Sequence, residues 1–238
     1  MDTFEILSQL CSAAGVSGAE GSAAETAAKL LEEYGEVTLD NALGSVVCKV
    51  GSWEDGKPVM LLDAHIDEIG MIVTYITDDG FLKISGCGGL DTRLLLAQQV
   101  TVYGKEKLTG IVTSTPPHLE KDSSAAPELD SIFIDIGFTS RENAEKYVSL
   151  GDRVLIENKA ERLAGSRVTS KAIDDRSGCA VIIRTLELLG GQQTAYNIAV
   201  CFSTQEEVGE RGAKTAAYDI SADYAIVVDV SFAKTHYE

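Results

Sequence analysis

The sequence predicts an α/β fold in which a small β-barrel domain is inserted into a larger domain of helices and strands. Three observations lead to this prediction. Helical and strand patterns alternate at both ends of the chain, short β-branched runs fill its middle, and one apolar strand ends in a His-x-Asp motif. A chain of 238 residues accommodates one large domain or two modest ones. We therefore expect a discontinuous domain of residues 1–71 plus 165–238 and an inserted β-rich domain of residues 72–164.

The first part of the chain is expected to form two helices and three strands. Apolar residues recur at helical spacing from Phe4 to Cys11, and alanines from Ala24 onward mark a second helix that ends near Gly35. Strands are expected at 37–40, 45–50 and 58–64. The last of these is apolar along both faces, which is typical of a strand in a sheet covered by helices.

The middle and the end of the chain have different patterns. Between Gly, Asp-Gly and Pro-Pro turns, the middle predicts strands at 72–77, 81–85, 99–103, 110–114, 132–136 and 153–157, with a short helix near 141–150. After Gly165 the α/β pattern returns. We expect helices at 174–189 and 210–218 and buried strands at 197–203 and 224–228.

Composition excludes several classes of partner. The net charge of −17 argues against binding to nucleic acid or to an anionic membrane, because both need a basic surface. An acidic chain accommodates a divalent metal most easily. The five cysteines are widely spaced without a C-x-x-C pair, which favours reduced thiols over a disulfide framework. With no signal-peptide pattern at the N-terminus, we expect a cytoplasmic protein.

The His-x-Asp motif is the most informative stretch. His65 and Asp67 follow the apolar run 59–64, and their side chains share a face because strand side chains alternate with period two. Asp67 can then accept the second N–H of the imidazole and leave the other ring nitrogen for a metal. A partly exposed histidine at a strand end is the alternative when the motif stands alone.

Further acids occur at matching positions. Asp174 follows an extended stretch where a helix begins, Glu206 and Glu207 follow the strand at 197–203, and Asp229 ends the strand at 224–228. Ligands of open α/β sheets bind at the carboxyl ends of strands. One histidine with several carboxylates suits a pair of divalent metals, zinc or cobalt above all.

The two adjacent glutamates are expected to point in different directions and to serve different functions. One can bind a metal while the other stays unligated and accepts a proton from the activated water as general base. The alternative is that Glu206-Glu207 is only a charged turn on the surface. The apolar strand before the pair and Val208-Gly209 after it favour the functional interpretation.

Three motifs carry a family resemblance: Ala64-His65-Ile66-Asp67-Glu68-Ile69-Gly70, Lys171-Ala172-Ile173-Asp174-Asp175-Arg176 and Gln205-Glu206-Glu207-Val208-Gly209. Together they resemble the co-catalytic metallo-aminopeptidases that assemble as tetrahedral dodecamers. This family contains glutamyl and deblocking aminopeptidases, and some members have been labelled endoglucanases. The resemblance extends through the insertion, where Pro116-Pro117-His118-Leu119 and Ile134-Asp135-Ile136-Gly137 also look like the family.

The resemblance implies a three-layer α/β metallopeptidase domain and a function for each site residue. His65 and Asp229 would be terminal metal ligands, Asp174 would bridge two metals, and Glu207 would ligate the second. Glu206 would be the general base, and Asp67 would orient His65. Asp175 and Arg176 would be structural, His118 would be noncatalytic, and the insertion would be the dimerisation domain.

The chain departs from the family at its C-terminal side. The family completes its second metal with a histidine in a C-terminal segment that this sequence lacks, since it stops shortly after Asp229. His236 is a poor substitute, because a ligand on a free tail must be ordered first. The sequence therefore leaves open whether the chain binds two metals, one or none. We also expect exposed apolar surface where the absent segment would pack.

These residues leave several functions open. The first is an aminopeptidase that hydrolyses peptides and self-associates as a dimer or a dodecamer. A catalytically silent fragment or shell subunit of the same family is the main alternative, favoured by the absent histidine. A glycosidase is disfavoured by the single tryptophan, Trp53. A serine or cysteine hydrolase is disfavoured because Gly15-Val16-Ser17-Gly18 is no nucleophile elbow and few histidines remain to act as base.

Overall fold

The computed structural model describes residues 1–40, 42–114 and 126–231 of the chain. The structure divides into two compact units, residues 1–68 with 159–238 and residues 69–158. The sequence places the same two junctions a few residues further along the chain, at 71/72 and 164/165. Each unit has a hydrophobic core of its own.

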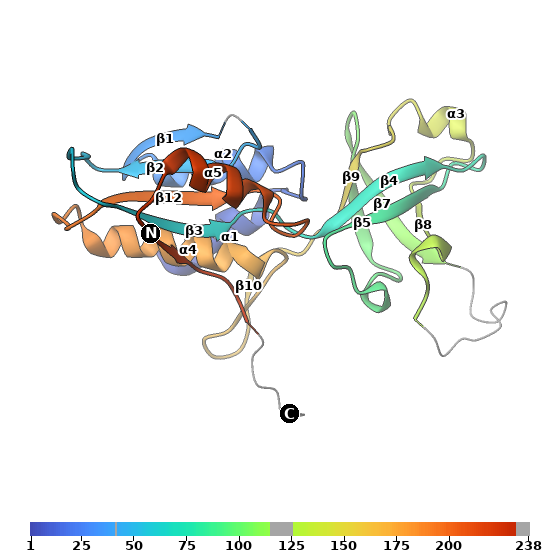
Figure 1. The fold of residues 1–238 in the computed structure, drawn as a ribbon. Helices are drawn as coiled ribbons and strands as arrows, with labels where there is room; N and C mark the ends of the chain where they lie inside the picture. Colours follow the sequence, from blue (N-terminus) through green and yellow to red (C-terminus); the bar gives the residue numbers. More distant parts are fainter. Residues whose placement is uncertain (41, 115–125, 232–238) are drawn as a thin grey trace. The chain divides into compact units, whose positions relative to one another are not determined.

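A five-stranded sheet forms the centre of the first unit. Its strands are β1 (Gly35–Leu39), β2 (Val46–Val50), β12 (Asn197–Ser203), β3 (Val59–His65) and β13 (Tyr224–Val227), in that spatial order. The strands β12, β3 and β13 run parallel to one another (Figure 1). Strand β2 is antiparallel to both of its neighbours, β1 and β12. The carboxyl ends of the three parallel strands therefore meet at one edge of the sheet.

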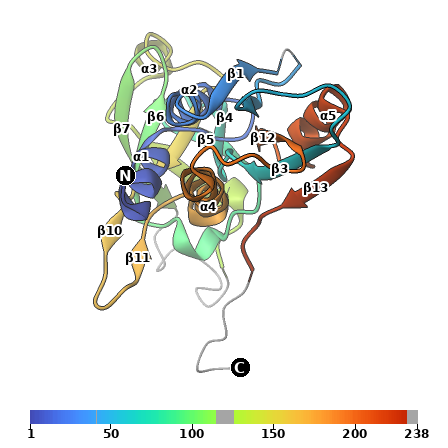
Figure 2. The same cartoon turned by 90° about the vertical axis from the view of Figure 1, so that its left-hand side faces the viewer.

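Helices cover both faces of this sheet. The helices α1 (Thr3–Ser12), α2 (Gly21–Leu31) and α4 (Ile173–Leu189) pack on one face, where Leu10, Ala27 and Ile183 join the main core. On the other face α5 (Arg211–Ile220) packs through Ala216 (Figure 2). The predicted three-layer α/β arrangement is confirmed.

Strand β13 differs from its prediction. The sequence predicts a buried strand, but Tyr224, Ile226 and Val227 are 56%, 52% and 67% exposed. The reason is its place at the edge of the sheet, where β3 is its only strand neighbour among the described residues. The expected exposed apolar surface is present there.

The second unit is a closed six-stranded barrel, as predicted. Its strands in spatial order are β4 (Gly70–Ile76), β5 (Leu82–Cys87), β8 (Ile132–Asp135), β7 (Lys107–Ser114), β6 (Gln99–Tyr103) and β9 (Arg153–Ile156). Pairing of β9 with β4 closes the barrel. Alternate side chains such as Val100, Val102 and Val154 fill its interior, as the period-two pattern requires.

Two helices are shorter than expected. Helix α3 spans only Arg141–Ala144, because the N–H groups of Lys146 and Tyr147 bond three residues back and tighten the chain into turns. Helix α2 ends at Leu31, before the expected Gly35.

A short hairpin, β10 (Glu161–Arg162) with β11 (Val168–Thr169), precedes α4. In the described ranges, no helix combines the length and the apolar character needed to cross a membrane.

The five cysteines are buried, and none of them forms a disulfide.

Candidate metal centre

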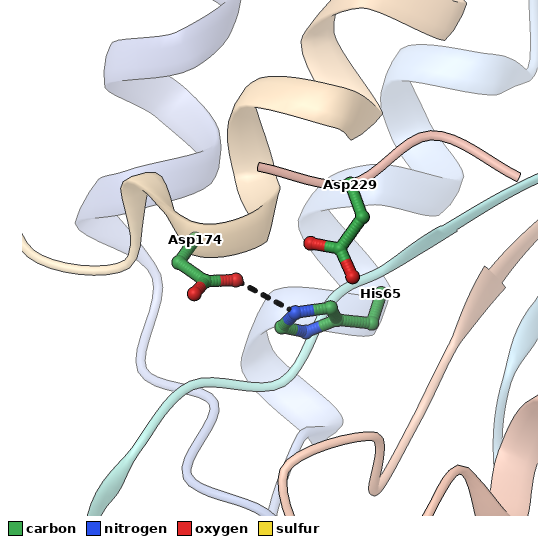
Figure 3. Close-up of side chains that lie close together, drawn as sticks. All are labelled: His65, Asp174 and Asp229. Carbon is green, nitrogen blue, oxygen red and sulfur yellow. Dashed lines mark hydrogen bonds and ion pairs between the residues drawn. The ribbon is translucent and has the colours of Figure 1, made fainter. Parts of the chain in front are cut away.

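The structure brings His65, Asp174 and Asp229 together at the carboxyl edge of the sheet. His65 is the last residue of β3, Asp174 lies in the first turn assigned to α4, and Asp229 follows β13. Figure 3 shows the carboxylates of Asp174 and Asp229 facing the imidazole of His65 from two different segments. One ligand atom from each residue lies within 4.8 Å of the other two. Within the part of the chain that the structure describes, this is the one such group of three.

The chemistry of these donors suits a divalent cation. The Nε2 atom of His65 lies 2.9 Å from Oδ1 of Asp174, so the nitrogen faces the carboxylates directly. His65 is only 4% exposed, whereas the side chain of Asp174 is 57% exposed and Asp229 is also exposed. A buried imidazole with open carboxylates on one side gives a fixed nitrogen ligand and accessible oxygen ligands, the mixed set that zinc and cobalt accept.

The second ring nitrogen of His65 faces Asp67. Its Nδ1 atom lies 3.1 Å from the main-chain oxygen of Asp67 and 3.4 Å from the carboxylate Oδ1. The N–H at Nδ1 thus has acceptors, which leaves Nε2 toward Asp174. Burial alone lowers the pKa of His65, but the hydrogen bonds to Asp67 and Asp174 and the negative charges of Asp67 and Asp175 outweigh it and raise the pKa to about 10.

Asp67 is fully buried and joins the histidine to the glutamate loop. Its carboxylate accepts hydrogen bonds from the backbone N–H groups of Glu206 at 3.0 Å and Glu207 at 3.2 Å. It also accepts one from the hydroxyl of Ser17 at 2.5 Å. Burial opposes ionisation, but these donors together with His65 lower the pKa of Asp67 below its usual value. Asp67 therefore remains a carboxylate and holds three chain segments.

The two glutamates lie beside the group of three rather than within it. The Oε2 atom of Glu206 lies 3.9 Å from Nε2 of His65. Burial raises the pKa of Glu206, with His65 opposing and Asp229 adding to the effect. Burial likewise raises the pKa of Glu207 to about 7, with His65 opposing and the negative charge of Asp174 adding to the effect. Both carboxylates are therefore easier to protonate than an ordinary glutamate.

Asp175 and Arg176 are both inaccessible to solvent, each with 0% exposure. Asp175 accepts a hydrogen bond from the N–H of Gly178, while its Oδ2 atom has no hydrogen-bond partner among the described residues. Burial raises the pKa of Asp175 to about 7. Arg176 donates to the main-chain oxygens of Leu10, Ala13 and Ile66 and to Glu68. Its bonds tie together the segments that carry the site.

Two histidines of the sequence-based predictions, His118 and His236, lie outside the described residues. Ser17 and Glu20 were not predicted as site residues. Glu20 is 6% exposed, and an acid two residues after Gly18 stands out only once its burial is known.

Comparisons with known proteins point to one family. Residues 44–238 match the family model described as M42 glutamyl aminopeptidase. A relative from Acetivibrio thermocellus is 38% identical over 231 residues, which cover 97% of this chain and 66% of the relative. The solved structure of a TET aminopeptidase from a marine sediment Thaumarchaeota archaeon is 33% identical, with a TM-score of 0.91 over 98% of this chain and 66% of that one.

A further solved structure bears on assembly. The Pyrococcus horikoshii TET1 peptidase, which can assemble into a tetrahedron or a large octahedral shell, is 31% identical, with a TM-score of 0.86. The match covers 96% of this chain and 68% of that one. The chain thus spans about two thirds of the length of these relatives.

Proposed function

Because this chain belongs to the M42 glutamyl aminopeptidase family, we propose that it removes N-terminal residues from peptides by metal-dependent hydrolysis. The observation that carries the proposal is the meeting of His65, Asp174 and Asp229 within 4.8 Å at the carboxyl edge of the sheet. Ligand sites of open α/β sheets occur at this edge.

The donor set fits two divalent ions, zinc or cobalt. In the proposed site His65 and Asp229 would be terminal ligands, Asp174 would be shared by the two ions, and Glu207 would ligate the second. The carboxylate of Asp174 supports a shared position, because its Oδ1 atom lies 2.9 Å from Nε2 of His65 while its side chain remains 57% exposed. When bound, such ions polarise the scissile carbonyl and lower the pKa of water.

Glu206 is the proposed general base. Its carboxylate lies beside the ligand group without belonging to it, and its raised pKa brings proton affinity closer to neutral pH. Oε2 of Glu206 accepts a proton from the attacking water and passes it to the departing amine. The backbone bonds from Glu206 and Glu207 to Asp67 keep this carboxylate at a fixed distance from His65.

Asp67 is the proposed orienting residue. Its main-chain oxygen and its carboxylate both face Nδ1 of His65, which fixes the tautomer and the rotation of the ring. Although full burial opposes ionisation, the hydrogen bonds from His65, Ser17 and the backbone of Glu206 lower the pKa of Asp67 and keep it charged across the range in which the enzyme would work.

The test is a peptidase assay of the chain loaded with zinc or cobalt. We expect release of the first residue from a free tripeptide and none from the same tripeptide with an acetylated N-terminus. Glu206→Gln should slow release by about 10²- to 10⁴-fold, and Glu210→Gln, which changes an exposed acid nearby, should not. Hydrolysis of cello-oligomers in place of peptides would contradict the proposal. Metal binding without any hydrolysis would favour the silent shell subunit instead.

We also propose that the protein self-associates and lies in the cytoplasm. The related TET1 peptidase forms shells, which supports self-association of this chain through its barrel unit, residues 69–158. Peptides are the expected substrates. The net charge of −17 supports a protein without nucleic-acid or membrane partners, and the five buried cysteines without a disulfide support a reducing compartment such as the cytoplasm.

A further inference from the structure

We propose that the segment Ala13–Glu20, here called the N-terminal loop, positions the segment Gln205–Glu207, here called the acidic loop. Ser17 and Glu20 are the positioning residues. The inference rests on the proposed function, in which Glu206 is the base and Glu207 a ligand. Neither Ser17 nor Glu20 belongs to the ligand group, so both act through other residues.

Ser17 acts on Asp67. The hydroxyl of Ser17 is 4% exposed and donates to Oδ2 of Asp67 at 2.5 Å. The same oxygen accepts the backbone N–H of Glu207, while Oδ1 accepts that of Glu206. A carboxylate with donors on both oxygens cannot rotate without losing one of them. Ser17 therefore fixes the plane of the Asp67 carboxylate, and that plane fixes the backbone of Glu206 and Glu207.

Glu20 acts on the residue before the base. Its side chain is almost fully buried and accepts a hydrogen bond from the backbone N–H of Gly18 at 2.6 Å, and its carboxylate also interacts with the backbone N–H of Gln205. Gln205 has a φ of 57°, a left-handed conformation that residues other than glycine adopt only when their surroundings hold them there. The interaction with the Glu20 carboxylate is one such constraint, and it acts at the residue from which the chain enters Glu206.

The N-terminal loop is itself anchored. Gly15 donates its N–H to Oε1 of Glu68 at 2.9 Å and accepts the N–H of Glu68 at 3.0 Å, while the N–H of Ser17 bonds to the main-chain oxygen of Glu68. Lys171 and Arg176 lie within 3.1 Å of the Glu68 carboxylate, both almost entirely buried. Ser17 and Glu20 are therefore presented from a rigid support and not from a mobile turn.

The experiment compares Ser17→Ala and Glu20→Gln with two matched controls. Ser12→Ala removes an exposed hydroxyl that donates to the helix carbonyl of Ser8, and Glu25→Gln removes an exposed charge on α2. Two quantities are measured on the whole chain: amide hydrogen exchange of the acidic loop by NMR, and the dissociation constant and visible spectrum of bound Co²⁺. The amide of Val200, in the middle of β12, reports whether the fold is intact.

We expect the amides of Glu206 and Glu207 in Ser17→Ala, and of Gln205 in Glu20→Gln, to exchange about tenfold faster, as the loss of one polar contact that supports the acidic loop predicts. Both variants should weaken Co²⁺ binding by roughly three- to tenfold, less than the loss of a direct partner of a ligand. The controls should match the unmodified chain. Exchange and Co²⁺ affinity that match the controls in both variants would overturn the proposal.

The exchange measurement keeps this proposal separate from the proposed function. The exchange measurement needs neither metal nor substrate. A chain that releases no amino acid would overturn the peptidase proposal, and the exchange rates would still decide whether Ser17 and Glu20 position the acidic loop. If the amide of Val200 is also faster in Ser17→Ala, that variant reports on folding, and Glu20→Gln decides.

Discussion

The Nε2 atom of His65 lies 2.9 Å from Oδ1 of Asp174, across 109 residues of sequence. This contact and the carboxylate of Asp67 on the other side of the ring favour the charged imidazole and raise the pKa of His65 to about 10. A metal needs the neutral ring, so metal and proton compete for the same nitrogen.

Metal binding should therefore release protons. Between pH 7 and 9 the unliganded His65 is protonated, and we expect about one proton released per ion bound at that nitrogen. Affinity should rise with pH across this window. Titration calorimetry in buffers of different ionisation enthalpy measures the number released. A binding enthalpy independent of the buffer would contradict the prediction.

The same pKa shift sets the pH dependence of stability in the metal-free chain. The folded pKa of about 10 lies above the ordinary value of 6.5, so the folded state holds the extra proton between these values. The contribution of His65 to the free energy of unfolding is complete below pH 6.5 and falls as the pH rises toward 10. Urea unfolding at several pH values, compared with His65→Gln, isolates this contribution. A difference that grows with pH would contradict the sign.

Glu206→Gln and Glu207→Gln should differ in what they remove. Loss of the base should lower kcat by about 10²- to 10⁴-fold with Co²⁺ affinity retained. Loss of the ligand should weaken binding of the second ion, and activity should recover in part at high metal concentration. Steady-state kinetics at several Co²⁺ concentrations separates the two. Metal rescue of Glu206→Gln would reverse the assignment.

Arg176 should be critical for stability. Arg176→Met leaves the buried Glu68 carboxylate with less compensating positive charge and leaves three main-chain oxygens without their donor. We therefore expect the free energy of unfolding to fall by about 3–5 kcal/mol. Urea unfolding followed by the fluorescence of Trp53 measures it. Arg162→Met serves as control, because the ion pair of Arg162 with Asp2 is exposed and should contribute little. Equal effects of the two variants would contradict the account.

The sequence was sufficient for the fold class and for where the acids gather. Runs such as 59–65 and 197–203 are long, apolar and bounded by turns, so both strands and their polar ends are readable from local pattern. The exposure of β13 was not readable, because its apolar sequence resembles an interior strand and only the strand order places it at an edge. The bond from Ser17 to Asp67 joins residues 50 apart, and no local pattern encodes it.

The exposed edge leads to a prediction of its own. Ile226 and Val227 point to opposite faces of β13, yet both are more than half exposed, and edge strands with apolar side chains promote association. Ile226→Lys should reduce binding of a hydrophobic dye and slow aggregation. Leu188→Lys changes a residue that is equally apolar and 71% exposed but lies on helix α4, so it should have less effect. An equal reduction by both variants would show that the edge is not special.

The metal content of the unmodified chain tests the central claim most directly. After exposure to zinc or cobalt and removal of loosely held ions, elemental mass spectrometry gives the number of ions per chain. The account predicts two ions per chain, and loss of binding in His65→Ala. One ion per chain would support the group of His65, Asp174 and Asp229 and contradict the paired site. A chain that retains no metal would contradict the metallopeptidase account as a whole.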